Sequence, residues 1–87
     1  MPSVIMYSTM ICPYCSRARH LLKRKGVVFE EIAVDQDPEQ RAAMRRRSRR
    51  DTVPQILIDD RQIGGYDDLA MLDAVGELDR LLATDDA

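Results

Sequence analysis

Short apolar runs alternate along the chain with longer segments in which apolar and polar positions follow a helical spacing. The short runs predict four strands, at residues 3–8, 27–34, 53–58 and 61–64. Residues 13–25 predict a helix, because Ala18, Leu21 and Leu22 share one face and basic residues occupy the rest. A second helix is expected from Pro38 to about residue 49. Apolar residues spaced by three or four positions then predict helical structure from Leu69 onward.

Turn and cap residues separate these segments. Gly26 follows the basic end of the first helix as a C′ residue, and residues 35–38 form a turn and cap before the second helix. Asp59 and Asp60 predict a hairpin turn, and Gly76 a break in the last helical segment. A helix between the first two strands makes those strands parallel, with a right-handed crossover. The whole order predicts an α/β fold, a four-stranded mixed sheet with helices on both faces.

The length and composition predict one small domain. At 87 residues the chain has no room for a second core, so residues 1–87 form a single domain, with a frayed tail at residues 84–87. The net charge of −2 predicts no general attraction to nucleic acid or to a membrane. Since no apolar run approaches a membrane span and no signal peptide is visible, we expect a cytoplasmic protein, and a monomer by default.

The charges are nevertheless segregated. Residues 1–50 hold eleven Lys or Arg against five Asp or Glu, whereas residues 59–87 hold two against nine. The arginine-rich run at residues 45–50 is compatible with nucleic-acid binding. Because the chain offers no aromatic stacking platform and is acidic overall, a solvated helix face, or a surface that steers acidic disulfide partners, is the favoured interpretation.

Cys12 and Cys15 are the only cysteines, and they lie where the first strand meets the first helix. Unpaired N–H groups at a helix start stabilise a thiolate, and such Cys-x-x-Cys pairs have thiol pKa values of roughly 3.5–7.5 rather than about 8.5. Pro13 suits the first helical position, where an N–H would have no partner. We therefore expect Cys12 to be the exposed nucleophile at the cap and Cys15, one turn further in, to be the more buried, resolving thiol.

Two other interpretations of this pair are an inert buried pair and half of a metal site. A mononuclear metal site normally needs about four ligands, and no second cluster exists, so no metal is expected. His20 is the sole histidine, and an ordinary helix residue is favoured over a ligand or a base.

Three motifs together resemble a known family. Residues 12–15 read Cys-Pro-Tyr-Cys, residues 52–54 read Thr-Val-Pro and residues 64–68 read Gly-Gly-Tyr-Asp-Asp. In order and spacing the chain resembles, over essentially its whole length, a glutaredoxin close to the short bacterial glutaredoxin 3 type. The resemblance implies a thioredoxin-like fold and a glutathione-dependent thiol–disulfide oxidoreductase. Such an enzyme reduces protein disulfides and glutathione mixed disulfides, and cycles between the dithiol and a Cys12–Cys15 disulfide.

The resemblance also implies a groove for glutathione, the reducing co-substrate. The residues that it assigns to this groove are Tyr14, Thr52, Val53, Pro54, Gly65, Tyr66, Asp67 and Asp68. The bond before Pro54 would be cis, and the Val53 backbone would pair with glutathione as with an added strand. Residues 65–68 would hold the γ-glutamyl end, with the side-chain contact left open between Asp67 and Asp68.

One position departs from the family pattern. Many glutaredoxins have a lysine three residues before the first active-site cysteine, and this chain has Thr9 there. We therefore expect weaker electrostatic activation of Cys12 than in those relatives. Arg41, on the second helix, is the residue we expect to supply the missing cation to glutathione.

The expected partners are glutathione and disulfide-containing or glutathionylated proteins, with ribonucleotide reductase among the possible targets. One alternative is a thioredoxin-like electron donor fed by a flavin reductase, against which the motif at residues 64–68 argues. A second alternative is an iron–sulfur cluster carrier, against which Pro13 and the second thiol argue.

Overall fold

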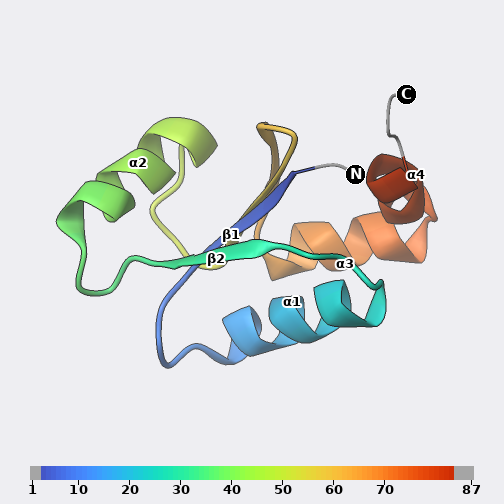
Figure 1. Cartoon of the computed structure of the whole chain (residues 1–87), viewed down its shortest axis with the longest axis horizontal. Helices are drawn as coiled ribbons and strands as arrows, with labels where there is room; N and C mark the ends of the chain where they lie inside the picture. The colour runs from blue at the N-terminus through green and yellow to red at the C-terminus, as the bar shows by residue number, and fades with distance from the viewer. Residues whose placement is uncertain (1–2, 84–87) are drawn as a thin grey trace.

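The computed structural model describes residues 3–83, which form one sheet and its flanking helices (Figure 1). In chain order the elements are β1 (Val4–Ser8), α1 (Pro13–Arg24), β2 (Glu30–Ala33), α2 (Pro38–Ser48), β3 (Gln55–Ile58), β4 (Arg61–Gly64), α3 (Tyr66–Ala74) and α4 (Glu77–Ala83). The predicted order of strands and helices is confirmed. The frayed tail that we expected at residues 84–87 lies outside the described residues.

The four strands are arranged in the order β2-β1-β3-β4. β1 pairs in parallel with β2, whereas β3 runs antiparallel to both β1 and β4. Figure 1 shows α2 over one face of this sheet, and α1 and α3 over the other. The predicted mixed sheet with helices on both faces is therefore confirmed.

Side chains that alternate along β1 and β3 divide the core into two clusters, because successive residues of a strand point to opposite faces. Met6 and Ile56 belong to the cluster on the side of α1, α3 and α4, where Leu22 and Leu78 are also fully buried. On the side of α2 the buried residues are Tyr7, Val34, Met44 and Leu57. The sheet thus holds the active-site end of β1 between two packed layers.

Three strands are shorter than predicted, β1 by a single residue because it begins at Val4. β2 begins at Glu30, not at residue 27, because Val27 still belongs to the end of α1. The Val27 N–H donates to the Leu22 carbonyl and the Gly26 N–H donates to the Lys23 carbonyl, which is the Schellman pattern of a helix end. β3 begins at Gln55, since Pro54 has no N–H for a strand ladder.

The predicted turns lie where the sequence places them. Asp59 and Asp60 have φ angles of 53° and 65°, and two such residues in succession form the tight turn that joins antiparallel strands. Gly76, with a φ angle of 81°, separates α3 from α4. The first turn leads through β4 to α3, which lies on the same side of the sheet as α1 (Figure 1).

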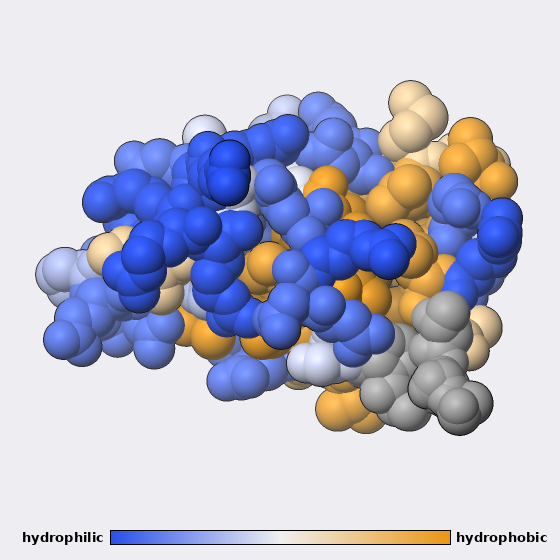
Figure 2. All heavy atoms as spheres, turned by 90° about the horizontal axis from the view of Figure 1, so that it is seen from above, coloured by the Kyte–Doolittle hydropathy of each residue, from blue (hydrophilic) through white to orange (hydrophobic). Residues whose placement is uncertain are grey.

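Much of the arginine-rich run is paired with acidic residues of this chain. Arg45 contacts Asp51 at 2.9 Å, and Arg47 contacts both Asp60 and the Tyr7 hydroxyl at 2.8 Å. Figure 2 shows hydrophilic side chains covering the end of the molecule where α2 lies, while apolar ones gather toward α4. No helix within residues 3–83 has the length and apolar character to span a membrane.

Candidate active site

Cys12 caps the N-terminus of α1. Its backbone is extended, with φ −154° and ψ 110°, and Pro13 occupies the first helical turn. The Cys15 N–H donates to Cys12 Sγ at 3.3 Å. An otherwise unpaired donor at the helix start therefore points at the sulfur, as the sequence predicts.

The surroundings of Cys12 favour its thiolate. Partial burial by itself raises the pKa of this thiol, but hydrogen bonds that lower the pKa outweigh it. The donors are the Cys15 thiol, the backbone N–H groups of Cys15 and Tyr14, and the Thr9 side chain. The pKa of Cys12 is consequently lowered from its ordinary value. Since the thiolate is the reactive form, Cys12 is the better nucleophile of the pair at neutral pH.

Cys15 has the opposite character. It is fully buried in the first turn of α1, and burial raises its pKa to about 12, with further contributions from the hydrogen bond and the charge of Cys12. The Thr9 backbone N–H and the charge of Arg19 oppose this rise. One thiol is thus held ready to ionise while its neighbour stays protonated.

Thr9 acts on both sulfurs, though it carries no charge. Its side chain donates a hydrogen bond that favours the Cys12 thiolate, and its backbone N–H favours the Cys15 thiolate. At the position where the family pattern has a lysine, this chain therefore contributes hydrogen bonds instead of a cation.

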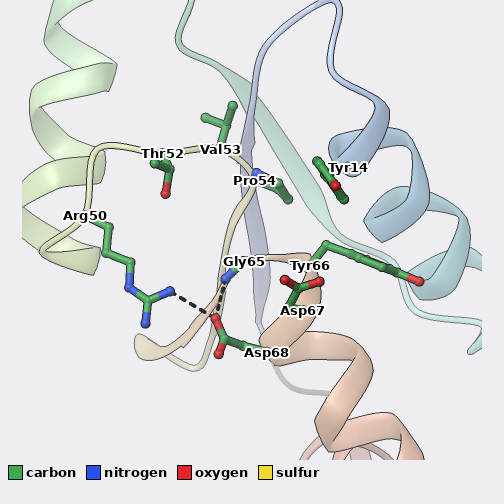
Figure 3. A pocket seen from close by; sticks show the side chains of 9 residues that line it. All are labelled: Tyr14, Arg50, Thr52, Val53, Pro54, Gly65, Tyr66, Asp67 and Asp68. Carbon is green, nitrogen blue, oxygen red and sulfur yellow. Dashed lines mark hydrogen bonds and ion pairs between the residues drawn. The ribbon is translucent and has the colours of Figure 1, made fainter.

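A groove opens beside the cysteine loop (Figure 3). The residues that line it are Tyr14, Arg50, Thr52, Val53, Pro54, Gly65, Tyr66, Asp67 and Asp68. All eight residues that the resemblance assigns to glutathione on the basis of the three motifs come together here, from three segments distant in the chain. The Val53–Pro54 bond is cis. Within residues 3–83 no hydrogen-bond partner is found for the backbone of Val53.

Arg50 is the lining residue that the sequence did not suggest. Arg49 ends α2 with a φ angle of 62°, which turns the chain so that Arg50 leaves the helix face and reaches the groove. Its Nη1 donates to Asp68 Oδ2 at 3.0 Å. The only signal in the sequence is its position two residues before Thr52, inside a run that we interpreted as a solvated helix face.

The two aspartates of the groove differ in their partners. Asp68 Oδ2 accepts from the Gly65 N–H at 3.0 Å and from Arg50, and these two contacts, the Gly65 bond first, lower the pKa of Asp68. No described residue pairs with the carboxylate of Asp67, which lies next to Gly65 and Tyr66 in Figure 3. Asp68 is therefore engaged within the protein, and the Asp67 carboxylate is free for a ligand.

The Gly-Gly pair allows the groove to close tightly around these contacts. Gly64 has a φ angle of 119°, and a Cβ atom on it would collide with the Asp68 carboxylate. A Cβ atom on Gly65 would lie 3.4 Å from the carbonyl oxygen of Pro54. Any side chain at Gly64 would thus displace the carboxylate that anchors the start of α3.

The structure does not bring Arg41 to the groove. Arg41 lies on α2, and both its Nε and its Nη2 donate to Asp51, at 3.0 Å to Oδ1 and 3.0 Å to the backbone carbonyl. Arg41 lines a separate hollow near residues 34–38. The cation that reaches the groove is Arg50.

Aromatic rings form the lip of the groove nearest the cysteines. Tyr14 is about half exposed, and its ring centroid lies 6.4 Å from that of Tyr66. The Arg17 guanidinium lies over the Tyr14 ring, 5.3 Å from its centroid, at a distance typical of a cation–π contact. The exposed Tyr14 ring of α1 therefore has Tyr66 of α3 and Arg17 as its neighbours.

A reactive thiolate, a second thiol and a groove with free backbone groups suit attack on a disulfide attached to a short peptide. The groove offers such a peptide a free carboxylate at Asp67 and a guanidinium at Arg50. Among the side chains of residues 3–83, no three His, Cys, Asp or Glu gather as metal ligands would.

Comparisons with known proteins agree on one family. A family model described as Glutaredoxin matches residues 4–63. Glutaredoxin 3 of Escherichia coli K12 is 52% identical over 82 residues, which cover 94% of this chain and 99% of that protein. The solution structure of glutaredoxin from Brucella melitensis superposes with a TM-score of 0.85 at 49% identity, covering 100% of this chain and 95% of that one. A buckwheat glutaredoxin–glutathione complex superposes with a TM-score of 0.84 at 28% identity, covering 93% of this chain and 76% of that one.

Proposed function

The chain belongs to the glutaredoxin family, and we propose from this premise that Cys12 is its attacking thiolate and Cys15 its resolving thiol. As a dithiol glutaredoxin with a thioredoxin-like fold, it is a glutathione-dependent thiol–disulfide oxidoreductase. The observation that carries the assignment is the opposite environment of the two sulfurs. The pKa of Cys12 is lowered at the helix cap, whereas burial raises that of Cys15 to about 12.

The proposed cycle begins when the Cys12 thiolate attacks a disulfide. With a glutathione mixed disulfide, Cys12 takes the glutathione and releases the substrate as a thiol. A second glutathione then attacks the sulfur of the bound glutathione, giving glutathione disulfide and free Cys12. With a protein disulfide, Cys15 attacks Cys12 and leaves a Cys12–Cys15 disulfide, which two glutathione molecules reduce.

We assign glutathione to the groove in Figure 3. The unpaired backbone of Val53 suits an extended peptide that adds a short strand. The free carboxylate of Asp67 suits the ammonium group of the γ-glutamyl residue, and the Arg50 guanidinium suits a carboxylate. The assignment is supported by the buckwheat relative, which was solved in complex with glutathione.

Measurement of the Michaelis constant for glutathione tests which residues of the groove contact the ligand. Because Asp67 and Arg50 contact the ligand in this proposal, Asp67→Asn and Arg50→Ala each raise that constant several-fold. Arg41→Ala is the matched control, since Arg41 is paired with Asp51 outside the groove. A larger effect from Arg41→Ala than from Arg50→Ala would return the role of groove cation to Arg41.

The decisive experiment follows reduction of a small glutathione mixed disulfide, coupled to glutathione, glutathione reductase and NADPH. Wild type, Cys12→Ser and Cys15→Ser are compared side by side, and a protein disulfide is tested as a second substrate. Cys15→Ser should keep the first activity and lose most of the second. Cys12→Ser should lose both.

Two results would contradict this division of roles. If Cys15→Ser lost both activities, the second thiol would be needed for attack as well as for resolution. If wild type showed no glutathione-dependent turnover, the groove assignment would fail, and Thr9 would be the first residue to examine.

We further propose that residues 1–87 act as one monomeric domain in the cytoplasm, where glutathione maintains reducing conditions. The cycle needs no metal, because the thiolate is itself the nucleophile. Its protein targets would be disulfide-containing or glutathionylated proteins, ribonucleotide reductase among them. Trapping with the Cys15→Ser variant, which keeps the mixed disulfide with a protein target, identifies these targets.

A further inference from the structure

Arg19 lies one helical turn after Cys15 on α1, so the two side chains share a face of the helix. Its guanidinium is fixed by Glu31 of β2. Arg19 Nε donates to Glu31 Oε1 at 2.8 Å, Nη2 donates to Oε2, and the two side chains are each about 30% exposed. Two parallel bonds of this kind fix the orientation of the guanidinium plane.

Glu31 is itself held in place from β1. The Ser8 hydroxyl donates to Glu31 Oε2 at 2.8 Å, and the Arg19 and Ser8 bonds, that of Arg19 first, lower the pKa of Glu31 despite its partial burial. Ser8 immediately precedes Thr9, whose backbone N–H favours the Cys15 thiolate. A hydrogen-bonded chain therefore connects the end of β1, β2 and the helix that carries Cys15.

This cluster is separate from the glutathione groove. Ser8, Arg19 and Glu31 line a hollow with Thr9, Met10 and Ala33. None of these residues lines the groove. A change at Arg19 can therefore be made without touching a residue assigned to glutathione.

We propose that Arg19, oriented by Glu31, is a positioning residue for the resolving step, in which it favours the thiolate of Cys15. This role rests on the proposed function, because it requires Cys15 to attack a mixed disulfide at Cys12. Arg19 touches neither the substrate nor the sulfurs that exchange bonds, and it acts through its charge.

The charges around Cys15 change as the cycle proceeds. In the resting dithiol, burial and then the hydrogen bond and charge of Cys12 keep Cys15 protonated. Once the Cys12 sulfur is part of a mixed disulfide, it carries no negative charge, and both of its contributions disappear. Burial still raises the pKa of Cys15, and the groups that oppose it are the Thr9 N–H and, as the smaller contribution, the Arg19 cation, whose own partner is Glu31.

The resolving step balances without another reactant. The Cys15 thiol loses its proton to solvent, and its thiolate attacks Cys12 Sγ. The Cys12–Cys15 bond forms as the bond from Cys12 to the partner sulfur breaks, and the partner leaves as a thiolate that takes up a proton. The dithiol is oxidised by two electrons and the partner disulfide is reduced by two.

A single-turnover reaction with the aromatic disulfide DTNB separates the two steps. Attack by Cys12 releases one coloured thiolate, and attack by Cys15 on the resulting mixed disulfide releases a second. Raising the pKa of a thiol by one unit lowers its thiolate fraction about tenfold but raises its nucleophilicity, so that attack slows by about three-fold. We expect Arg19→Gln to slow the second phase, by about three-fold for each unit by which the pKa of Cys15 rises, and to shift its pH dependence to higher pH.

The variants include their own controls. Arg19→Lys keeps the charge but loses the two parallel bonds to Glu31, so it should restore part of the second-phase rate. Arg24→Gln removes an exposed charge of the same helix and should change neither phase. An Arg19→Gln protein that keeps the second-phase rate and its pH profile would overturn the proposal. Failure of Arg19→Lys to restore any of the rate in a protein with a native circular dichroism spectrum would also overturn it.

The Cys15→Ser variant distinguishes failure of this proposal from failure of the proposed function. It should release only one coloured thiolate per molecule. If it released two, Cys15 would not be the resolving thiol, and the proposed function would fail. If it released one while Arg19→Gln behaved as wild type, the role of Arg19 alone would be wrong.

Discussion

Thr9 illustrates at the level of one residue how a thiolate is favoured without a nearby lysine. Its side chain donates to Cys12, in addition to the donors that the start of α1 supplies. The Thr9 side chain is the smallest of the influences that lower the pKa of Cys12, after the Cys15 thiol and the N–H groups of Cys15 and Tyr14. At the position of the missing lysine, this side chain acts on the Cys12 thiolate in the direction in which a cation would act.

We predict that Thr9→Val raises the pKa of Cys12. Since a raised pKa leaves less thiolate at neutral pH, the rate of reaction with a small disulfide falls, and the rise of that rate with pH moves to higher pH. The measurement is the ultraviolet absorbance of the thiolate during a pH titration of the Cys15→Ser protein, with and without Thr9→Val.

Thr9→Ser is the matched control, because it keeps the hydroxyl and removes only a methyl group. It should titrate as the parent protein does. If Thr9→Val and Thr9→Ser titrated alike, the hydroxyl would have no part in the activation of Cys12.

At the level of elements, Asp68 connects the start of α3 to the segment that follows α2. It accepts from the Gly65 N–H at the helix start and from Arg50, which α2 delivers to the groove. A carboxylate is favourable at a helix N-terminus, where unpaired N–H groups give partial positive charge. The same side chain thus caps α3 and orients a residue that we assign to glutathione.

We predict that Asp68→Asn lowers the free energy of unfolding at neutral pH, by no more than about 1 kcal/mol because the ion pair is half exposed. The folded-state pKa of Asp68 is lowered, so its contribution is present above the ordinary pKa of an aspartate, near 3.9. That contribution is lost as the pH falls through the lowered value. Urea unfolding of both proteins at neutral and at acidic pH measures the difference.

Asp67→Asn serves as the comparison for this pH dependence, since Asp67 has no described partner. At neutral pH it should unfold closer to the wild-type urea concentration than Asp68→Asn does, because it loses only the favourable position of a carboxylate in the first turn of α3. A stability difference between wild type and Asp68→Asn that stayed constant down to strongly acidic pH would contradict the role assigned to the carboxylate.

At the level of the whole molecule, α4 is part of the main core despite its position after the family's motifs. Leu78 of α4 is fully buried in the cluster that also holds Met6 and Leu22. Lys25, just after α1, contacts Asp73 of α3 at 2.6 Å and Asp79 of α4 at 3.0 Å. The three helices on this side of the sheet therefore stabilise one another.

We predict that Leu78→Ala destabilises the whole fold by about 2–5 kcal/mol, because it leaves a cavity in the core. This is a large part of the roughly 5–15 kcal/mol that a small domain has. Thermal unfolding monitored by circular dichroism measures the effect, at about 4–8 °C per kcal/mol for a chain of this size.

Val75→Ala is the control, since Val75 is 65% exposed at the end of α3. Its unfolding temperature should stay close to that of wild type. If Leu78→Ala unfolded at the wild-type temperature as well, α4 would not belong to the cooperative core.

The sequence by itself determined the order of the elements and the identity of the reactive pair. These features depend on local rules. Apolar spacing distinguishes helix from strand, Gly26 and Pro13 mark helix ends, and a helix start lowers the pKa of a thiol wherever it occurs. Boundaries differ from the predicted ones where two local rules compete, as at Val27, which has strand character but completes the end of α1.

Only the tertiary structure decided which charged residues reach the groove. Arg41 and Arg50 belong to the same arginine-rich part of the chain, yet Arg41 pairs with Asp51 and Arg50 lies in the groove with Asp68. Our assignment of Asp67 rather than Asp68 to the ligand likewise depends on tertiary contacts, because the Asp68 carboxylate is already bound by the Gly65 N–H and Arg50. Some of these pairs join segments that are distant in the chain, and others depend on a single backbone angle, such as that of Arg49. Both depend on distances of a few ångströms, which the spacing of residues in the sequence does not encode.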